Sequence, residues 1–571
     1  MENNKTWLKV LIGILVVIWS FVTLNKGFYM DENGLLTLYK SIYSGQHMFV
    51  DSWDELQTGA VIVWPLMALY YQVLAAPLAG LGIGLVLYIR ICYMIIHLLV
   101  CCYVYYTLRC SDFEEGAFSA TMLYFMFVIG WRGLSYKTFS DLSIMLTICF
   151  LFRFHETRQL RFAVFGAIAV CVGILSYPTM IVMPFVIGFM MIWAIRHNYL
   201  SVNVLTAFVV TCVICGGLFL LYLGLTTGIS QAIAMLPNFG DNDYEESILM
   251  RVVRLLAYYA GMAVISYIPI LFILLIKKLR YMSERTEHVI LTVYWLVFLV
   301  AICALRYESI SISRFVYGII ILFFWFPYFM YEERENEYTT IGTYGIKDDN
   351  SRRLLWLVFG LSIAAQFTWM LATNQGVDIT GHMAIYVVML EIILFAREKQ
   401  GLMGLAHIVL ACALFFMGFW LPESNGGYND ILEARSLVTE GAYEGMELDT
   451  YDYERNQAVL QLTDNYISPE DYVLVCFGTK STGYLNMNAH FGTYGAYARC
   501  HVNRKLLDYW ELNPGNQATC VILDTADPNY EKFLAGECGQ YIMDTYTEEA
   551  ATSGSFILLR MEDSLEGSEG N

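Results

Sequence analysis

The stretch GLVLYIRICYMIIHLLVCCYVYYT, residues 84–107, decides the fold class of this chain. It contains no acidic residue, and its basic side chains are Arg90 and His97 alone. A helix of about 20 mainly apolar residues crosses the hydrocarbon core of a bilayer, which is about 30 Å thick. Residues 84–107 therefore predict a membrane-spanning helix.

Similar apolar runs, separated by short polar breaks, recur along the first 420 residues. We predict thirteen spans, which fall near residues 8–24, 84–107, 116–131, 139–153, 162–176, 179–195, 204–224, 252–276, 289–305, 315–330, 354–372, 383–396 and 402–420. The predicted fold class is an α-helical polytopic membrane protein.

The composition agrees with this class. The chain has 571 residues, of which 57% are hydrophobic and 15% charged, whereas an average soluble domain is about 45–50% apolar and about 25% charged. This excludes a soluble enzyme, a disordered chain and a nucleic-acid binder. The formal charge of -18 is concentrated in residues 421–571, which hold 25 acidic and 8 basic residues. We therefore predict a membrane domain over 1–420, an α/β domain over 421–560 and a disordered tail over 561–571.

One further apolar stretch, residues 60–81, carries Pro65 and Pro77. Counting it as a span would reverse the orientation of everything downstream. Leaving it out places the basic loops on the side of Lys5 and Lys9, as the positive-inside rule requires. We predict a re-entrant or interfacial helix on the outer face, within a first outer loop of residues 25–83. The N-terminus is then cytoplasmic, and the acidic C-terminal domain lies outside the plasma membrane.

Asp31 and Glu32 follow the first span by about seven residues. Adjacent carboxylates at a membrane surface repel one another and are partly desolvated, which makes at least one a better proton acceptor. Such a group suits general-base catalysis on a hydroxyl. Alternatively, Asp31 caps the helix that Leu35 to Tyr43 suggest.

The order of these features carries a family resemblance. The first span is followed by an Asp-Glu pair, an amphipathic helix, the polar segment 51–58, a proline-containing apolar helix and a second span with an early Arg90. This series resembles the GT-C superfamily of integral-membrane glycosyltransferases, notably protein mannosyltransferases and aminoarabinose transferases. The resemblance implies transfer of a sugar from a polyprenyl-phosphate carrier to a hydroxyl of a lipid, glycan or protein at the outer face. It makes Asp31 the catalytic residue and gives Glu32 a role at the acceptor.

The chain departs from the aminoarabinose transferases at two cationic positions. Gly34 replaces an Arg, and Glu55 to Thr58 replace a Glu-Lys-Pro-Pro run. Other cations must therefore meet the donor phosphate, because a desolvated phosphate is best bound by charge-assisted hydrogen bonds. The outer-side candidates are Arg132, Lys137, Arg306 and Arg314. The alternative is that they are interfacial anchors.

Further acidic and polar residues complete the predicted site. Asp141 is a plausible partner of Asp31, or else a charge placed at a helix N-terminus. Asp54, Glu55 and Gln57 are assigned to the acceptor side of the first outer loop. Asp51, Asp54 and Glu55 would bind a divalent cation only if they converged with other loops, and no His/Cys cluster has zinc spacing. We predict no cofactor.

Other features stay outside the predicted site. Arg90 lies near the outer end of its span, where it can extend to the headgroups, and a single His97 is typical of a satisfied bundle residue. In the tail, residues 472–478, 519–524 and 556–559 predict buried strands. Cys476, Cys500, Cys520 and Cys538 allow three disulfide connectivities.

Two other functions remain open. A flippase of lipid-linked glycans would place its polar residues within the spans and show internal repeats. An O-antigen-type polymerase or ligase would carry an Arg-rich loop late in the bundle and needs no acidic pair after the first span.

Overall fold

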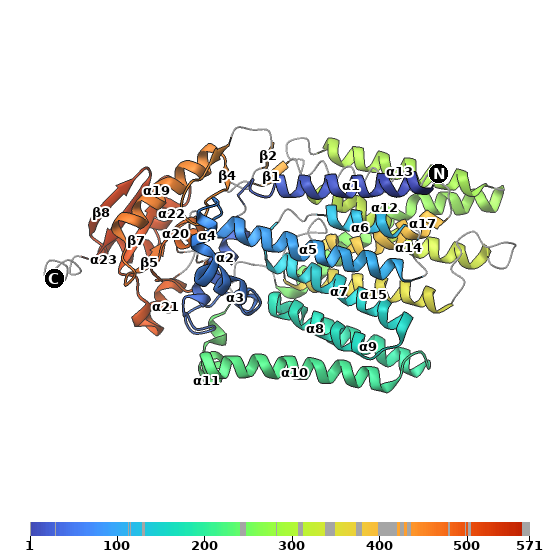
Figure 1. The fold of residues 1–571 in the computed structure, drawn as a ribbon, viewed down its shortest axis with the longest axis horizontal. Helices are drawn as coiled ribbons and strands as arrows, with labels where there is room; N and C mark the ends of the chain where they lie inside the picture. The colour runs from blue at the N-terminus through green and yellow to red at the C-terminus, as the bar shows by residue number, and fades with distance from the viewer. Residues whose placement is uncertain are drawn as a thin grey trace.

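The structure, a computed structural model, describes the chain except residues 1, 29, 112–113, 115, 128–131, 240–246, 281, 306–311, 337–348, 373–379, 398–419, 423–427, 431–434, 478–479, 497, 499, 501–503 and 562–571. Long helices lie side by side in a bundle, and a smaller domain containing a sheet covers one end of it (Figure 1). The predicted fold class is confirmed at this level, because a helical membrane domain is followed by a C-terminal α/β domain.

Most bundle helices are apolar over a length that spans a bilayer. The helices of the bundle are α1 (Glu2–Val22), α5 (Leu85–Arg109), α6 (Ala117–Met126), α7 (Tyr136–Thr157), α8 (Arg161–Ser176), α9 (Val182–Arg196), α10 (Val202–Thr226), α12 (Ile248–Leu279), α13 (Glu284–Leu305), α14 (Ile312–Asn336), α15 (Asp349–Ala372) and α17 (Ile385–Arg397). Within the described residues, eight helical stretches are long and apolar enough to cross a membrane, and five shorter apolar helices accompany them. Twelve of the predicted spans coincide with helices of these two groups. The predicted span 402–420 lies outside the described residues except for Trp420, which belongs to a strand. The chain is a multi-pass membrane protein.

Residues 25–83 leave the bundle and return to the same end. The segment contains α2 (Met30–Tyr43), α3 (Ala60–Leu69), a π-helical turn (Tyr70–Leu74) and α4 (Ala75–Ala79). By length and composition alone, Gln57–Ala79 would qualify as a span. However, Asn25 and Gly84, which flank the segment, both bond to the backbone of one hairpin, at Glu447 and Glu444. A single crossing between them is therefore excluded, and α2, α3 and α4 lie at the end of the bundle beside the C-terminal domain (Figure 1).

The hairpin that receives these two backbone bonds links the bundle to the C-terminal domain. It consists of β3 (Ser436–Leu437) and β4 (Glu447–Leu448), which pair antiparallel. Its turn packs so tightly that a Cβ on Gly445 would lie 2.1 Å from the carbonyl oxygen of Gly82. Gly445 also has a φ of 82°, which a side chain would strain. A further antiparallel pair, β1 (Trp420–Pro422) and β2 (Tyr428–Asp430), precedes the hairpin.

The C-terminal domain is a mixed five-stranded sheet between two layers of helices. The strand order is β6-β5-β7-β9-β8, in which β6, β5 and β7 are parallel and β9 and β8 antiparallel. The strands are β5 (Tyr472–Val475), β6 (His490–Phe491), β7 (Cys520–Asp524), β8 (Glu548–Ser553) and β9 (Phe556–Arg560), and the helices are α19 (Thr450–Tyr466), α20 (Lys480–Asn486), α21 (Lys505–Leu512), α22 (Tyr530–Leu534) and α23 (Glu537–Thr545). All three predicted strands are confirmed. The four cysteines of this domain are buried, and none of them forms a disulfide.

Alternation along the strands gives the sheet two apolar faces. Val473 and Val475 contribute to the core on one face, and Leu474 and Cys476 to the core on the other. This is the period of two expected of a strand covered on both sides. The second core also contains Trp53, which comes from the first outer loop. The loop and the C-terminal domain therefore share one hydrophobic core.

Candidate functional site

The acidic pair lies in the first turn of α2, at the end of the bundle that the C-terminal domain covers. Asp31 is partly exposed, whereas Glu32 is buried. Burial raises the pKa of Asp31, and the positive charge of Lys137 opposes that rise. Acidic residues in a first helical turn are also favoured by the helix dipole, so both sequence interpretations of the pair are compatible with this geometry.

Glu32 is held by Arg90 of α5. The Nε and Nη2 atoms of Arg90 donate to Oε1 and Oε2 of Glu32 at 3.0 and 2.9 Å. The remaining donors of Arg90 reach the carbonyl oxygens of Leu24, Lys26 and Gly27. Sequence reasoning placed Arg90 at the headgroups, and this was wrong. The carboxylate of Glu32 makes burial of the guanidinium more favourable than extension into the interface, because the pair is bidentate and fully hydrogen-bonded. The signal was present, since an ionisable residue inside a span is costly and points to function.

Residues 132–137 bring two of the predicted cations to the acidic pair. Arg132 donates to the carbonyl and hydroxyl oxygens of Thr23, both at 2.6 Å. Burial lowers the pKa of Arg132 to about 10, with Arg90 acting in the same direction and Glu32 against it. Lys137 is buried and acts electrostatically on Asp31. The site thus gathers two carboxylates and three cations at one end of the bundle.

Gly133 allows the cations of residues 132–137 to lie close to the acidic pair. A Cβ at this position would lie 2.2 Å from Oε1 of Glu32. Only a glycine lets the 132–137 segment approach the carboxylate so closely. Ser135 then caps α7 through a capping box with Thr138, which fixes the direction in which α7 leaves the site.

Asp141 lies one turn further along α7, buried among tyrosines. Tyr124 and Tyr386 donate their hydroxyls to its two carboxylate oxygens at 2.8 and 2.6 Å. The carboxylate of Asp141 is therefore bonded to two phenols inside the bundle. The buried His97 packs against the rings of Tyr93 and Tyr124, as expected of a bundle residue.

The predicted acceptor-side residues belong to a loop that is folded on itself. Gln57 is buried, its oxygen accepts from the backbone N–H of Phe49, and its amide nitrogen donates to the carbonyl oxygens of Ser52 and Asp54. Asp54 accepts from the backbone N–H of Leu56 at 2.9 Å, and Glu55 is exposed. Gln57 thus shapes the loop, while the carboxylate of Glu55 faces outward.

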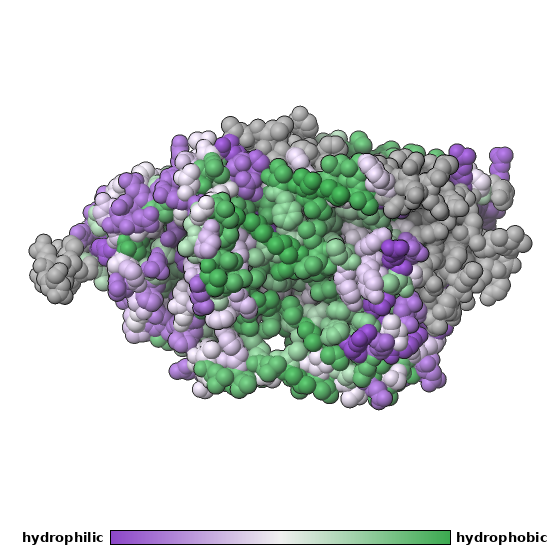
Figure 2. Space-filling view, viewed as in Figure 1, coloured by the Kyte–Doolittle hydropathy of each residue, from purple (hydrophilic) through white to green (hydrophobic). Residues whose placement is uncertain are grey.

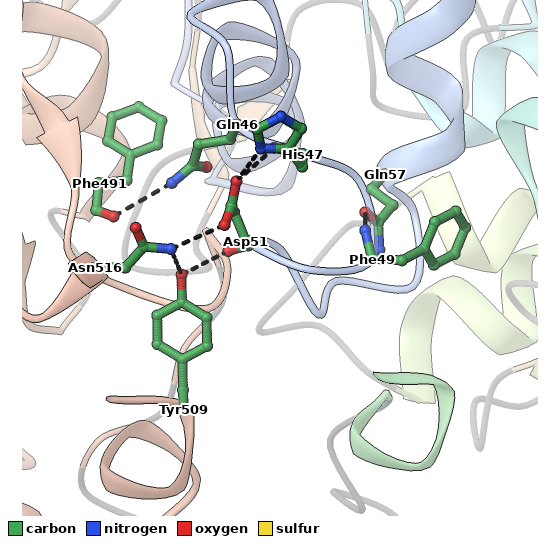
Figure 3. A network of polar contacts seen from close by, with 8 residues as sticks. All are labelled: Gln46, His47, Phe49, Asp51, Gln57, Phe491, Tyr509 and Asn516. Atoms are coloured by element: carbon green, nitrogen blue, oxygen red, sulfur yellow. Dashed lines mark hydrogen bonds and ion pairs between the residues drawn. The ribbon is translucent and has the colours of Figure 1, made fainter. Parts of the chain in front are cut away.

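The same loop is bonded to the C-terminal domain through a polar network (Figure 3). Asp51 accepts from Asn516 and His47, and its carbonyl oxygen accepts from the hydroxyl of Tyr509. Gln46 donates to the carbonyl oxygen of Phe491. Both carboxylate oxygens of Asp51 are therefore hydrogen-bonded within the protein.

Lys40 anchors the other end of α2 to the C-terminal domain. Its buried ammonium donates to the carbonyl oxygens of Tyr484, Leu485 and Met487, at 3.0, 2.9 and 2.6 Å. These carbonyls close the C-terminal end of α20, where a positive charge is favoured by the helix dipole. Sequence reasoning missed Lys40 and Trp53, because no local pattern pairs residues so far apart in the chain.

Two predicted cations cannot be placed. Arg306 lies outside the described residues, and Arg314 belongs to α14 in a part whose side chains are not described. Within the described residues, no group of three or more His, Cys, Asp or Glu side chains could hold a metal ion.

The fold and the site define a multi-pass α-helical membrane protein with a charged centre where its bundle meets a C-terminal α/β domain. No protein-family model and no curated protein matches the chain. Among solved structures, ArnT from Cupriavidus metallidurans bound to undecaprenyl phosphate matches with a TM-score of 0.43 and 12% identity, over 98% of each chain. The oligosaccharyltransferase AglB from Archaeoglobus fulgidus, in complex with an inhibitory peptide and a dolichol-phosphate, matches with a TM-score of 0.43 and 10% identity, over 95% of this chain and 73% of that one. Similarity of this degree does not assign an activity.

Proposed function

We propose that this protein is a membrane glycosyltransferase that moves a sugar from a polyprenyl-phosphate carrier to a hydroxyl acceptor on the outer face of the plasma membrane. The observation that carries the proposal is that the two neighbouring carboxylates differ in burial and in the cation beside them. Glu32 is buried and bound by Arg90, whereas Asp31 is partly exposed beside Lys137 and has a raised pKa. A raised pKa makes Asp31 a better base than an ordinary carboxylate.

The proposed reaction follows from these positions. Asp31 accepts the proton of the acceptor hydroxyl as its oxygen attacks the anomeric carbon of the donor sugar. The bond between that carbon and the carrier phosphate breaks with inversion, and the carrier phosphate leaves as an anion. Lys137 and Arg132 supply positive charge beside Asp31 and Glu32, where a leaving phosphate needs it.

The orientation is part of the proposal. The helix α7 begins beside Asp31 and ends 22 residues later, which is about 33 Å away at 1.5 Å per residue. Arg153, Arg158 and Arg161 lie at that far end, and the positive-inside rule places them in the cytoplasm. The charged centre and the C-terminal domain then lie outside.

The test is sugar transfer by purified protein in liposomes supplied with radiolabelled polyprenyl-phosphate sugar. We expect Asp31→Asn to lower transfer by about 100-fold or more, the scale of a lost general base, while Glu114→Gln, an exposed carboxylate at the far end of α5, leaves it unchanged. Release of carrier phosphate separates a transferase from a flippase, which only moves the intact donor. Undiminished transfer by a well-expressed Asp31→Asn protein would overturn the proposal.

A further inference from the structure

A cavity among the described residues lies at the opposite end of α7 from the charged centre. Its volume is about 160 Å³, and it is lined by residues of α7, α8, α9, α10 and α15 and of the connections between them. Most of its lining is apolar, with Phe162 of α8 and Ala194 of α9 among the lining side chains. An apolar cavity of about 150 Å³ in another protein stays dry and binds benzene. This cavity therefore has room for an apolar group of about six carbons.

The part of the cavity where α7 ends and α15 begins, which we call its mouth, is cationic. Arg158, at the C-terminal end of α7, and Arg353, near the start of α15, both line it together with His155. The guanidinium of Arg353 stacks on Tyr199 at 3.9 Å from the ring centroid. Glu156 lies beside His155 at 3.9 Å, but none of the described residues that line the cavity is acidic. The mouth thus adds positive charge to a cavity whose lining is otherwise mostly apolar.

The cavity lies against the lipid-facing side of the bundle. Trp193, which lines it, is 50% exposed, and Phe189 on the same helix is 73% exposed. Hydrophobic side chains also cover α10, and hydrophilic residues gather at the end of the bundle away from the C-terminal domain (Figure 2). The apolar chamber adjoins hydrocarbon, and its cationic mouth lies at the level where helices end. This arrangement matches a lipid that has an apolar chain and an anionic headgroup.

We propose that this cavity binds an anionic phospholipid of the cytoplasmic leaflet, with the start of one acyl chain in the chamber and the phosphate between Arg158 and Arg353. The acyl chain gains little by moving from bilayer to cavity, because lipid tails are as apolar as the lining. The headgroup contacts must then decide occupancy, since guanidinium and phosphate form strong charge-assisted bonds. A zwitterionic phospholipid carries the same phosphate but adds a cationic amine, which the positive charges of Arg158 and Arg353 repel. The site should therefore favour anionic over zwitterionic phospholipid.

The polyprenyl-phosphate carrier has the same phosphate chemistry, but its place in the proposed reaction is at the opposite end of α7, beside Asp31. The lipid site does not depend on the proposed sugar transfer, because it uses none of the residues of the charged centre. An assay of lipid binding alone consequently tests it.

The experiment uses the full-length protein in phosphatidylcholine nanodiscs that contain a small fraction of phosphatidylglycerol with a photoactivatable group near the start of one acyl chain. After irradiation, labelled peptides are quantified by mass spectrometry. We expect peptides from α7, α8 and α9 around the cavity to be labelled at least about fivefold more than with phosphatidylcholine carrying the same group, the scale of one cation near an anionic lipid. Labelling of the lipid-facing side of α12 serves as the internal reference for a folded protein.

Two variants and two controls sharpen the test. Ala194→Leu fills the chamber, and the pair Arg158→Gln and Arg353→Gln removes the charge of the mouth; each should abolish the preference for phosphatidylglycerol. Val213→Leu on the exposed face of α10 and Arg109→Gln at the same end of the bundle should leave it intact. Equal labelling by the two phospholipids, insensitivity to Ala194→Leu, or displacement by equimolar polyprenyl phosphate would each overturn the proposal.

Discussion

Arg90 and Glu32 form a bidentate ion pair in which both side chains are almost completely buried, at 3% and 4% exposure. The pair joins α5 to the first turn of α2, so the position of Asp31 depends on it. Arg90 also bonds to three backbone carbonyls between Leu24 and Gly27. One guanidinium thereby joins the segment that follows α1 to the first turn of α2, which contains the acidic pair.

Replacing Arg90 by Met should strongly destabilise the protein. Removing one partner of a buried ion pair leaves the other charge uncompensated, which costs about 3–5 kcal/mol. The midpoint of thermal unfolding in detergent measures the loss. The double variant Arg90→Met, Glu32→Gln should recover part of it, because no charge is then left unpaired.

The matched control lies at the other end of the same helix. Arg109 pairs with Glu114, and both are more than 60% exposed. Arg109→Met should cost less than about 1 kcal/mol, as is usual for an exposed pair. If Arg90→Met were no more harmful than Arg109→Met, the ion pair would not hold the site together.

Gly133→Ala should disrupt the same pair from the opposite side. The new Cβ would lie 2.2 Å from Oε1 of Glu32, so the carboxylate must move away from Arg90. We expect a loss of about 1–3 kcal/mol in the free energy of unfolding, the usual cost of overpacking, with lower sugar transfer. Gly217→Ala on α10 meets nothing within 4 Å and provides the control. Equal stability of the two variants would contradict the close approach.

The bundle could be predicted from the sequence because span length and apolar composition are local properties. That residues 60–81 do not form a single crossing was also predictable, since the positions of Lys and Arg along the whole chain argue against counting them as a span. The strands of the tail followed from short runs of apolar residues ended by turn residues. Each of these predictions depends on neighbours in the chain.

The charged centre was only partly predictable. Asp31, Glu32, Arg132 and Lys137 could be identified because polar residues between spans are few. The partner of Glu32 could not, because Arg90 lies 58 positions away in a span where extension to headgroups is the commoner fate of an arginine. Lys40 and its carbonyl partners are separated by more than 440 positions, and such pairings are set by tertiary packing alone.

Lys40→Met should loosen the C-terminal domain from α2. The substitution leaves carbonyl oxygens of Tyr484, Leu485 and Met487 without their buried donor, at a cost of about 1–3 kcal/mol per unsatisfied group. Hydrogen exchange should rise in α20 and in residues 46–57, which contact the same domain. Lys532→Met on the exposed face of α22 is the control. Unchanged exchange in α20 would show that Lys40 does not anchor the domain.

The pH dependence of sugar transfer should report on the relation between Lys137 and Asp31. The proposed reaction needs Asp31 ionised, so kcat/KM should fall as the pH drops through its raised pKa. Lys137 lowers that pKa by its positive charge. Removing the charge with Lys137→Met should therefore raise the pKa of Asp31 and move the acidic limb of the profile to higher pH. The height of the profile also falls if Lys137 meets the donor phosphate, but the position of the limb is independent of that loss.

Arg109→Met should leave the limb in place. If the acidic limb of the pH profile is unchanged in Lys137→Met, or moves to lower pH, then Asp31 is not the group whose ionisation controls transfer.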